Sequence, residues 1–198
     1  MAPPLVWIDL ETTGLDPRSD RILEVGLAAT DDNLDPIPGI DPYQTVIYQE
    51  DFDVRKYDAA VIEMHANSGL LTEIAAGRGA RRDQAEHRMR IWLHNLSNRY
   101  LDPENAGFLM AGSTVGQFDR QFFSRAWPKL MEPFHYRVLD VSSIKELVRR
   151  LYGDDAVYSA EDAARDDIVV KAHRVLPDIE ASIAELRFYV NSYFAGRP

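Results

Sequence analysis

Cysteine is absent from this chain, which excludes disulfide bonds and any metal site with thiolate ligands. A metal ion bound here would therefore need oxygen or imidazole ligands. Long apolar runs are also missing, because no stretch approaches the roughly 20 apolar residues that a membrane-crossing helix needs. The N-terminus has neither the basic start nor the apolar core of a signal peptide. These absences predict a cytoplasmic protein.

Basic residues are few, with 22 lysines and arginines against 32 acidic residues and a net charge of −10. Proteins that hold long nucleic acids contact many phosphates with basic side chains, so this balance has the wrong sign for such a role. A solvated acidic surface is the simplest explanation. If the ligand is a nucleic acid, the charge predicts a short strand or one held mainly through metal ions.

The chain has 198 residues, 45% of them hydrophobic, which predicts a single domain over residues 1–198. Apolar stretches predict strands at residues 5–10, 22–30, 45–49, 108–111 and 136–141. Helical spacing predicts helices at residues 54–64, 68–75, 84–96, 120–130 and 142–151, and a closing helix that runs to about residue 194. We expect Asp83 to cap the third of these helices and Ser142 or Ser143 the fifth. The composition of residues 152–167 predicts a loop or lid. The order predicts an α/β fold, with a mixed central sheet of about five strands flanked by helices.

The first candidate site residues lie on the first predicted strand, in the sequence WIDLETTGLDP. Asp9 and Glu11 are two residues apart, so strand alternation places both carboxylates on the same face. Two acids on a core strand are costly unless a cation compensates, and hard oxygen ligands suit Mg²⁺ or Mn²⁺. The alternative is a solvent-facing pair at the end of a strand.

Two further acids and a histidine lie beside predicted helix starts. Asp119 follows a strand in GSTVGQFDRQFF, where an ordinary helix cap is an equally natural role. His173 precedes Asp178 by five residues, a spacing that would point the side chains about 140° apart on a regular helix. Pro177 is tolerated only in a first turn, so the helix should begin near residues 174–176, with His173 before it. A partly buried structural role is the alternative for His173.

Four carboxylates on three elements, with a histidine at this spacing, resemble the DEDDh 3′→5′ exonucleases, which include proofreading exonucleases and ribonuclease T. The chain is most similar to the oligoribonucleases, at WIDLETTGLDP, HANSGL, HYRVLDVSSIKEL and DIEASIAELRFY. The resemblance covers nearly the whole chain. It implies a ribonuclease-H-like fold and an enzyme that hydrolyses short RNA from the 3′ end to nucleoside 5′-monophosphates.

The resemblance also implies catalytic roles. Two divalent ions, Mg²⁺ or Mn²⁺, would be held by four carboxylates, those of Asp9, Glu11, Asp119 and Asp178. Two cations about 3.5–4 Å apart can stabilise both the attacking and the leaving oxygen of a phosphodiester displacement. His173 would be the general base, a role to which the ordinary pKa of imidazole is matched.

Five positions would contact the substrate by the same resemblance. Leu15 corresponds to a wedge against a base and Thr114 to a small hydroxyl position. His65, Tyr136 and Arg137 match a basic and hydroxylated cluster that caps the 5′ phosphate of a dinucleotide in oligoribonucleases. Part of that cluster comes from the second subunit of a homodimer, which implies a homodimer here. For Tyr136 and Arg137, a strand-edge pair packed on a neighbouring helix is the alternative.

The sequence departs from the oligoribonuclease pattern at several places. Ala60 stands where similar proteins carry a tryptophan that stacks on a base, a contact worth roughly 1–3 kcal/mol. Phe118 resembles an insertion before the motif aspartate, Pro177 replaces a commonly acidic residue, and residues 153–167 show no clear match. These changes indicate a divergent member of the family, for which a phage or mobile element would be one source.

Three alternative functions remain open. A DEDDh exonuclease acting on single-stranded DNA or longer RNA is favoured by Ala60 and the unmatched segment, and opposed by the acidic charge and the HYRVLDVSSIKEL motif. A catalytically silent interaction module with the exonuclease fold is disfavoured because all five catalytic positions keep the required chemistry. An unrelated metal phosphatase is also disfavoured, because its chemistry would not require His173 and Asp178 to be paired.

Overall fold

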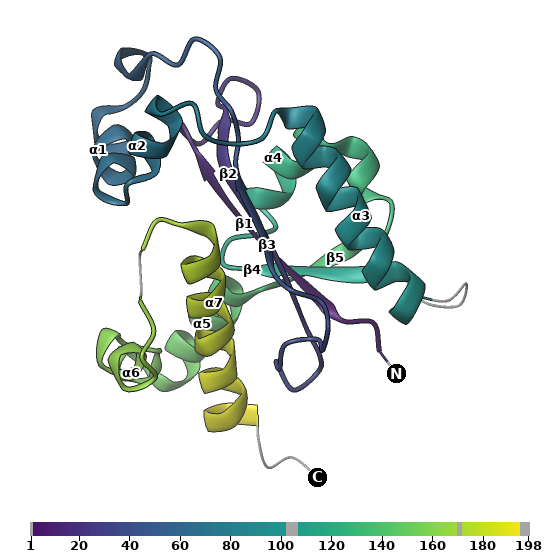
Figure 1. The fold of residues 1–198 in the computed structure, drawn as a ribbon. Helices are drawn as coiled ribbons and strands as arrows, with labels where there is room; N and C mark the ends of the chain where they lie inside the picture. The colour runs from purple at the N-terminus through teal and green to yellow at the C-terminus, as the bar shows by residue number, and fades with distance from the viewer. Residues whose placement is uncertain (1, 102–106, 170–171, 195–198) are drawn as a thin grey trace.

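The computed structural model describes residues 2–101, 107–169 and 172–194. A five-stranded sheet crosses its centre in the order β3-β2-β1-β4-β5 (Figure 1). Its strands are β1 (Leu5–Thr12), β2 (Ile22–Thr30), β3 (Tyr43–Val46), β4 (Phe108–Gly112) and β5 (Phe134–Asp140). The first three form an antiparallel meander, whereas β4 and β5 run parallel to β1. The predicted mixed sheet of about five strands is therefore confirmed.

Helices cover both faces of the sheet (Figure 1). One layer contains α3 (Arg82–Tyr100) and α4 (Asp119–Ala126), and the other contains α5 (Val141–Tyr152) and α7 (Val175–Tyr189). Strand alternation assigns the side chains of β1 to these layers. Val6, Ile8 and Leu10 join the core beneath α3 and α4, while Trp7 joins the core beneath α5 and α7. Asp9 and Glu11 continue the face of Trp7, so they point toward α7.

Two short helices stand at one end of the sheet, above β1 and β2 (Figure 1). They are α1 (Ala59–Asn67) and α2 (Leu70–Ala75), and a single 3-10 turn, η1 (Val54–Lys56), precedes them. A small apolar cluster holds α2 on the sheet through Leu23, Val46, Leu70 and Ile74. This arrangement brings α1 and α2 close to the carboxyl end of β1, where the acidic residues lie.

Both predicted helix caps differ from those in the structure, and the helix predicted at residues 54–64 is divided into η1 and α1. The cap of α5 is Asp140, whose Oδ1 accepts hydrogen bonds from the backbone N–H groups of Ser142 at 3.0 Å and Ser143 at 3.4 Å. The prediction of a serine cap was therefore wrong by two or three residues, because an aspartate at the strand end already satisfies these donors. Asp83 lies in the first turn of α3 instead of capping it. There the Gln84 side chain accepts from the backbone N–H of Arg81 at 3.1 Å.

Residues 152–167, predicted as a loop or lid, contain ordered helical structure. A 3-10 turn, η3 (Asp154–Ala156), is followed by α6 (Ala160–Arg165). Ser159 and Asp162 cap α6 reciprocally, and Ala163 is buried in the same core as α7. The abundance of Asp and Ala in this segment comes from a capped helix with one buried face.

The remaining elements are a 3-10 turn η2 (Pro128–Met131) and a π-helical turn η4 (Val190–Phe194) that continues α7. Within the described part of the chain, no helix combines the length and the apolar character that crossing a membrane requires.

Candidate active site

Strand β1 carries the first two acids of the site and faces the start of α7. Asp9 pairs with Gly26 of β2, and Glu11 pairs with Glu24. A Cβ atom at position 26 would lie 2.7 Å from the Cβ of Val175, the first residue of α7. Glycine at this position therefore permits the helix to rest directly on the sheet. The close approach brings Asp178, in the first turn of α7, next to the two acids of β1.

Asp119 supplies a third acid from the start of α4. It is the first residue of the helix, and Phe118 occupies the capping position. The Asp119 side chain is only 2% exposed, and its Oδ1 has no hydrogen-bond partner among the described residues. A helix N-terminus favours a carboxylate, but burial is the larger effect and raises the pKa of Asp119 to about 8. A buried acceptor without a donor is a natural place for a cation.

His173 and Asp178 flank the break at the start of α7. The helix begins at Val175, as Pro177 predicted, and His173 precedes it with a positive φ of 51°. The Asp178 Oδ1 atom accepts a hydrogen bond from the Ala172 backbone N–H at 3.1 Å, which folds this segment back over the helix start. Ligand atoms of Glu11, His173 and Asp178 all lie within 4.8 Å of one another. The structure thus brings both predicted residues to the acids of β1.

Burial and mutual repulsion shift the protonation of these acids. The pKa of Asp9 lies well above its usual value because of burial and then the charges of Asp119, Glu11 and Asp178. Burial, followed by the charge of Asp178, raises the pKa of Glu11 to about 8. Burial also raises the pKa of Asp178. Acids that oppose one another's ionisation, together with the unpartnered Asp119 oxygen, form a donor set that fits hard divalent cations.

Arg174, directly after His173, ties the start of α7 to two other elements. Its guanidinium donates to Glu24 Oε2 at 2.9 Å and Oε1 at 2.7 Å, and to Glu73 Oε1 of α2 at 2.9 Å. Glu24 is 1% exposed, so this bidentate pair keeps a buried charge compensated next to Glu11. The sequence alone did not predict this contact. Only the pairing of Glu11 with Glu24 across two strands could have signalled the need for a nearby cation.

Leu15 and Thr114 lie on loops at the same end of the sheet. Leu15 is 82% exposed in the turn between β1 and β2. Thr114 has a positive φ of 57°, and its backbone N–H donates to Asp140 Oδ1 at 3.1 Å. Its hydroxyl lies 3.2 Å from that of Ser142. Asp140 therefore fixes both the start of α5 and the loop that carries Thr114.

His65 is placed differently from the other predicted substrate residues. Its side chain on α1 is completely buried, and Nε2 donates to the carbonyl oxygen of Thr12 at 2.8 Å. Nδ1 faces Glu11 Oε2 at 3.7 Å, and burial lowers the pKa of the imidazole. Because α1 and β1 enclose the imidazole, it is not exposed to a nucleic acid bound at the site. It supports the end of β1 behind Glu11.

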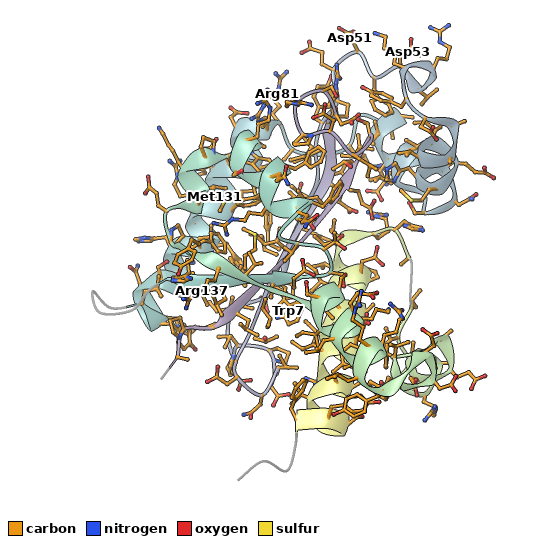
Figure 2. The ribbon with its side chains drawn as sticks, turned by 180° about the vertical axis from the view of Figure 1, so that it is seen from behind. Trp7, Asp51, Asp53, Arg81, Met131 and Arg137 are labelled. Atoms are coloured by element: carbon orange, nitrogen blue, oxygen red, sulfur yellow. The ribbon has the colours of Figure 1, made fainter. Side chains whose placement is uncertain are left out.

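Tyr136 and Arg137 lie on β5, the strand at the edge of the sheet. Tyr136 is 72% exposed, and the Arg137 guanidinium stands 5.2 Å from its ring centroid. The pair precedes Asp140 by three to four residues, roughly 10–13 Å along the strand. Figure 2 shows Arg137 far from the loops of Asp51 and Asp53. The structure does not bring this pair to the acids of the same chain.

A cavity of about 550 Å³ opens beside the acids and is bordered by Asp9, His173 and Asp178. Its other polar side chains come from the loop after β4, α5, the segment before α6, and α7, and include Ser113, Ser142, Lys145, Tyr158, Ser159, Ser182 and Glu185. Lys145 pairs with Glu185 at 3.0 Å across it. The sequence did not predict that Lys145 and Ser182 line this cavity, because only helix packing decides which helical side chains face a cavity.

The raised pKa values lead to a prediction for the metal-free protein. With ordinary pKa values of 4.5 and 3.8, Glu11 and Asp119 are ionised in the unfolded chain, whereas the folded protein keeps their protons up to about pH 8. The folded state binds more protons over this range, so we expect the free energy of unfolding to fall as the pH rises. Each group can contribute at most about 1.4 kcal/mol per pH unit.

Urea unfolding in a chelator between pH 6.5 and pH 8 tests this prediction. Below pH 6.5 the lowered pKa of His65 acts in the opposite direction, since the folded state then binds fewer protons at that imidazole. Asp119→Asn should reduce the slope, saturating Mg²⁺ should abolish it, and the exposed Asp32→Asn should leave it unchanged. A free energy of unfolding that is constant or rises with pH in the chelator would contradict the expectation.

Comparison with known families gives a match over most of the chain. Residues 6–186 match the family model described as "Exonuclease". The chain is 36% identical over 195 residues to the mitochondrial oligoribonuclease of Saccharomyces cerevisiae, covering 96% of this chain and 67% of that protein. It is also 36% identical over 199 residues to the oligoribonuclease of Mycobacterium tuberculosis (strain ATCC 25177 / H37Ra), covering all of this chain and 85% of that protein. The mitochondrial oligoribonuclease of Mus musculus is 34% identical over 194 residues, covering 98% of this chain and 75% of that protein.

Solved structures give the same fold at lower identity. Exonuclease I of E. coli, in a zinc-bound complex with single-stranded DNA, superposes with a TM-score of 0.69 at 16% identity. Exonuclease I of Methylocaldum szegediense superposes with a TM-score of 0.66 at 21% identity. This chain is covered to 98% in both cases but spans only 42% of each of those chains. The likeness shows a shared architecture.

Proposed function

This chain belongs to the exonuclease family and, within it, to the oligoribonucleases, and we propose that it hydrolyses short single-stranded RNA from the 3′ end to nucleoside 5′-monophosphates. The observation that carries this proposal is the convergence of Asp9, Glu11, Asp119, Asp178 and His173 at the carboxyl end of β1.

The family model spans residues 6–186, which supports a single exonuclease domain over residues 1–198. The lack of cysteine is compatible with the reducing cytoplasm, where we propose that the protein works.

The four acids would hold two divalent ions, Mg²⁺ or Mn²⁺, as the family's fold implies. When bound, such ions supply charge stabilisation to the attacking and leaving oxygens of a phosphodiester. Asp9 and Glu11 would bind them from the rigid strand β1, and Asp119 from the first turn of α4. Asp178 would complete the set, with its position held by the contact between α7 and Gly26. The mutual repulsion of these carboxylates supports the assignment.

His173 would accept the proton of the attacking water. Its imidazole is partly exposed at the cavity that borders Asp9 and Asp178. The hydrogen bond from Ala172 to Asp178 and the ion pairs of Arg174 fix the backbone on either side of it. A base held by two neighbouring anchors loses little freedom on reaching the geometry for proton transfer.

Leu15 would contact a base as a wedge, and the Thr114 hydroxyl would contact the terminal nucleotide. Tyr136 and Arg137 lie too far from the acids of their own chain to serve the same substrate. We therefore propose a homodimer in which this pair caps the 5′ phosphate at the partner's site. Exposed apolar side chains of α5, Leu147 and Leu151, lie on the helix that follows β5 and support a contact surface there.

The test of this function is the dependence of hydrolysis on strand length. We expect RNA of about two to five nucleotides to be hydrolysed with a higher kcat/KM than a 20-mer, because a cap on the 5′ phosphate leaves no path for a long strand and the acidic surface repels one. Arg137→Ala should lower kcat/KM for the dinucleotide by about tenfold or more, the usual worth of a charge-assisted phosphate contact.

Product ladders from 5′-labelled RNA and DNA of two to twenty nucleotides, with Mg²⁺ or Mn²⁺, measure this dependence. Arg55→Ala, in the exposed turn η1 where Arg55 pairs with Asp53, is the matched control. Equal kcat/KM for the 20-mer and the dinucleotide, with Arg137→Ala affecting both alike, would replace this function with a DEDDh exonuclease acting on single-stranded DNA or longer RNA.

A further inference from the structure

A cavity of about 780 Å³ has none of the site acids Asp9, Glu11, Asp119 and Asp178 in its lining. The turn after β1, the loop after β3, the start of α3 and the end of α4 form its walls. Four arginines line it, namely Arg18, Arg21, Arg82 and Arg125. They come from three separate parts of the chain, so only the folded protein brings them together. Four guanidinium groups thus border one cavity in a chain whose net charge is −10.

Three of these arginines have hydrogen-bond donors to spare. Arg18 pairs with Asp16, but no carboxylate within the described ranges lies within 4.0 Å of Arg21, Arg82 or Arg125. Arg21 donates to the backbone carbonyl of Glu50 at 3.0 Å, and Arg82 donates to that of Ala126. A guanidinium anchored at one nitrogen by a carbonyl keeps its full charge and most of its N–H groups for another acceptor.

Acidic residues at the same cavity balance much of this charge, but they do not pair with three of the arginines. Asp20 is occupied within its own turn, where it accepts from the Thr13 hydroxyl at 3.0 Å and from the Asp16 backbone N–H at 2.9 Å. Glu50 and Asp51 are exposed on the loop after β3. Three carboxylates border the cavity and Asp16 neutralises Arg18, which leaves the guanidinium groups of Arg21, Arg82 and Arg125 without an ion-pair partner among the described residues. An anion that binds here would be held by these three guanidinium groups.

A second hollow of about 490 Å³ adjoins the first and shares Tyr48, Glu50, Arg82 and Ala126 with it. It adds Arg81, whose guanidinium stands 5.7 Å from the centre of the Tyr48 ring, together with the carboxylates of Asp83 and Glu86. Figure 2 shows Arg81 near the end of the molecule that carries Asp51. Guanidinium forks match phosphate oxygens, and an exposed tyrosine beside an arginine offers a face on which a base can stack.

We propose that this arginine cavity is a second binding site, which takes the phosphate group of a nucleotide at a distance from the acids. Arg125 follows Asp119 by six residues on α4, about 9 Å along the helix. The phosphate belongs either to a free nucleoside monophosphate or to a strand whose 3′ end lies at the acids. The choice of a nucleotide as the ligand rests on the proposed function, whereas the affinity for phosphate rests on the arginines alone.

Titration with adenosine 5′-monophosphate in the presence of a chelator tests the site without any hydrolysis. Without metal ions the acids offer phosphate no cation to bind, so calorimetry or NMR shifts report on the arginine cavity. We expect Arg82→Gln and Arg125→Gln each to weaken binding by about tenfold or more, and adenosine without phosphate to bind at least tenfold more weakly. Arg90→Gln, an exposed arginine of α3 that contacts His87, should leave the affinity unchanged.

Hydrolysis rates with Mg²⁺ then identify the source of the phosphate. If it belongs to the strand, Arg125→Gln lowers kcat/KM for a decanucleotide about tenfold and leaves the dinucleotide unchanged. If it belongs to a free mononucleotide, the variant changes neither kcat/KM but still loses binding in the chelator. The proposal is overturned if the wild-type protein does not bind the monophosphate in the chelator, or if Arg82→Gln and Arg125→Gln bind it as well as Arg90→Gln. Failure to hydrolyse RNA would refute the proposed function and leave the titration result valid.

Discussion

Asp119→Ala should abolish hydrolysis while leaving the fold intact, and the same is expected for Asp9→Ala, Glu11→Ala and Asp178→Ala. Each substitution removes an oxygen ligand from a site whose bound ions supply several kcal/mol of charge stabilisation. A loss of about 4 kcal/mol corresponds to roughly a thousandfold fall in kcat. The free energy of unfolding without metal should hold or rise, because each change relieves repulsion among buried carboxylates.

Initial rates on a 5′-labelled dinucleotide at saturating Mg²⁺ or Mn²⁺ measure this effect, and urea unfolding in a chelator measures stability. Asp32→Ala, on an exposed turn, is the control for a lost carboxylate. Asp119 is the most informative of the four positions, because its Oδ1 has no described partner that alanine would leave unsatisfied. Near-wild-type turnover in any of the four variants would remove that residue from the site.

The second large effect is expected for His173→Ala, which should lower kcat by about 10²–10⁴-fold, the usual contribution of a positioned general base. Metal affinity should be preserved, because the four carboxylates remain. This point needs a direct measurement, since the imidazole lies within 4.8 Å of ligand atoms of Glu11 and Asp178. A large fall in metal affinity would identify His173 as a ligand.

The pH dependence of kcat separates the two roles further. If His173 is the base, the acid limb of the wild-type profile should disappear in His173→Ala. His94→Ala is the matched control, because His94 is an exposed histidine of α3 that contacts only Asn98 among the described hydrogen bonds. An acid limb that survives unchanged in His173→Ala would assign the titration to another group.

Residue types and local spacing could be interpreted from the sequence because they depend on the chain's own geometry. Asp9 and Glu11 had to share a face of β1, since side chains alternate along any strand. Pro177 could be accommodated only in a first turn, which predicted the start of α7 and the position of His173 before it. The order of strands and helices predicted the mixed sheet for the same reason.

Only the tertiary structure decided which distant residues meet, and at what depth. The contact of Arg174 with Glu24 joins residues 150 positions apart, and it depends on a glycine in β2 that permits α7 to rest on the sheet. The burial of His65 behind Glu11 follows from the docking of α1 and α2 at the end of β1, which periodicity does not specify. The distance of Tyr136 and Arg137 from the acids follows from the place of β5 at the sheet edge. Spacing along the chain determined the chemistry of the site, whereas burial and partnership depend on packing between elements, and packing is a property of the whole fold.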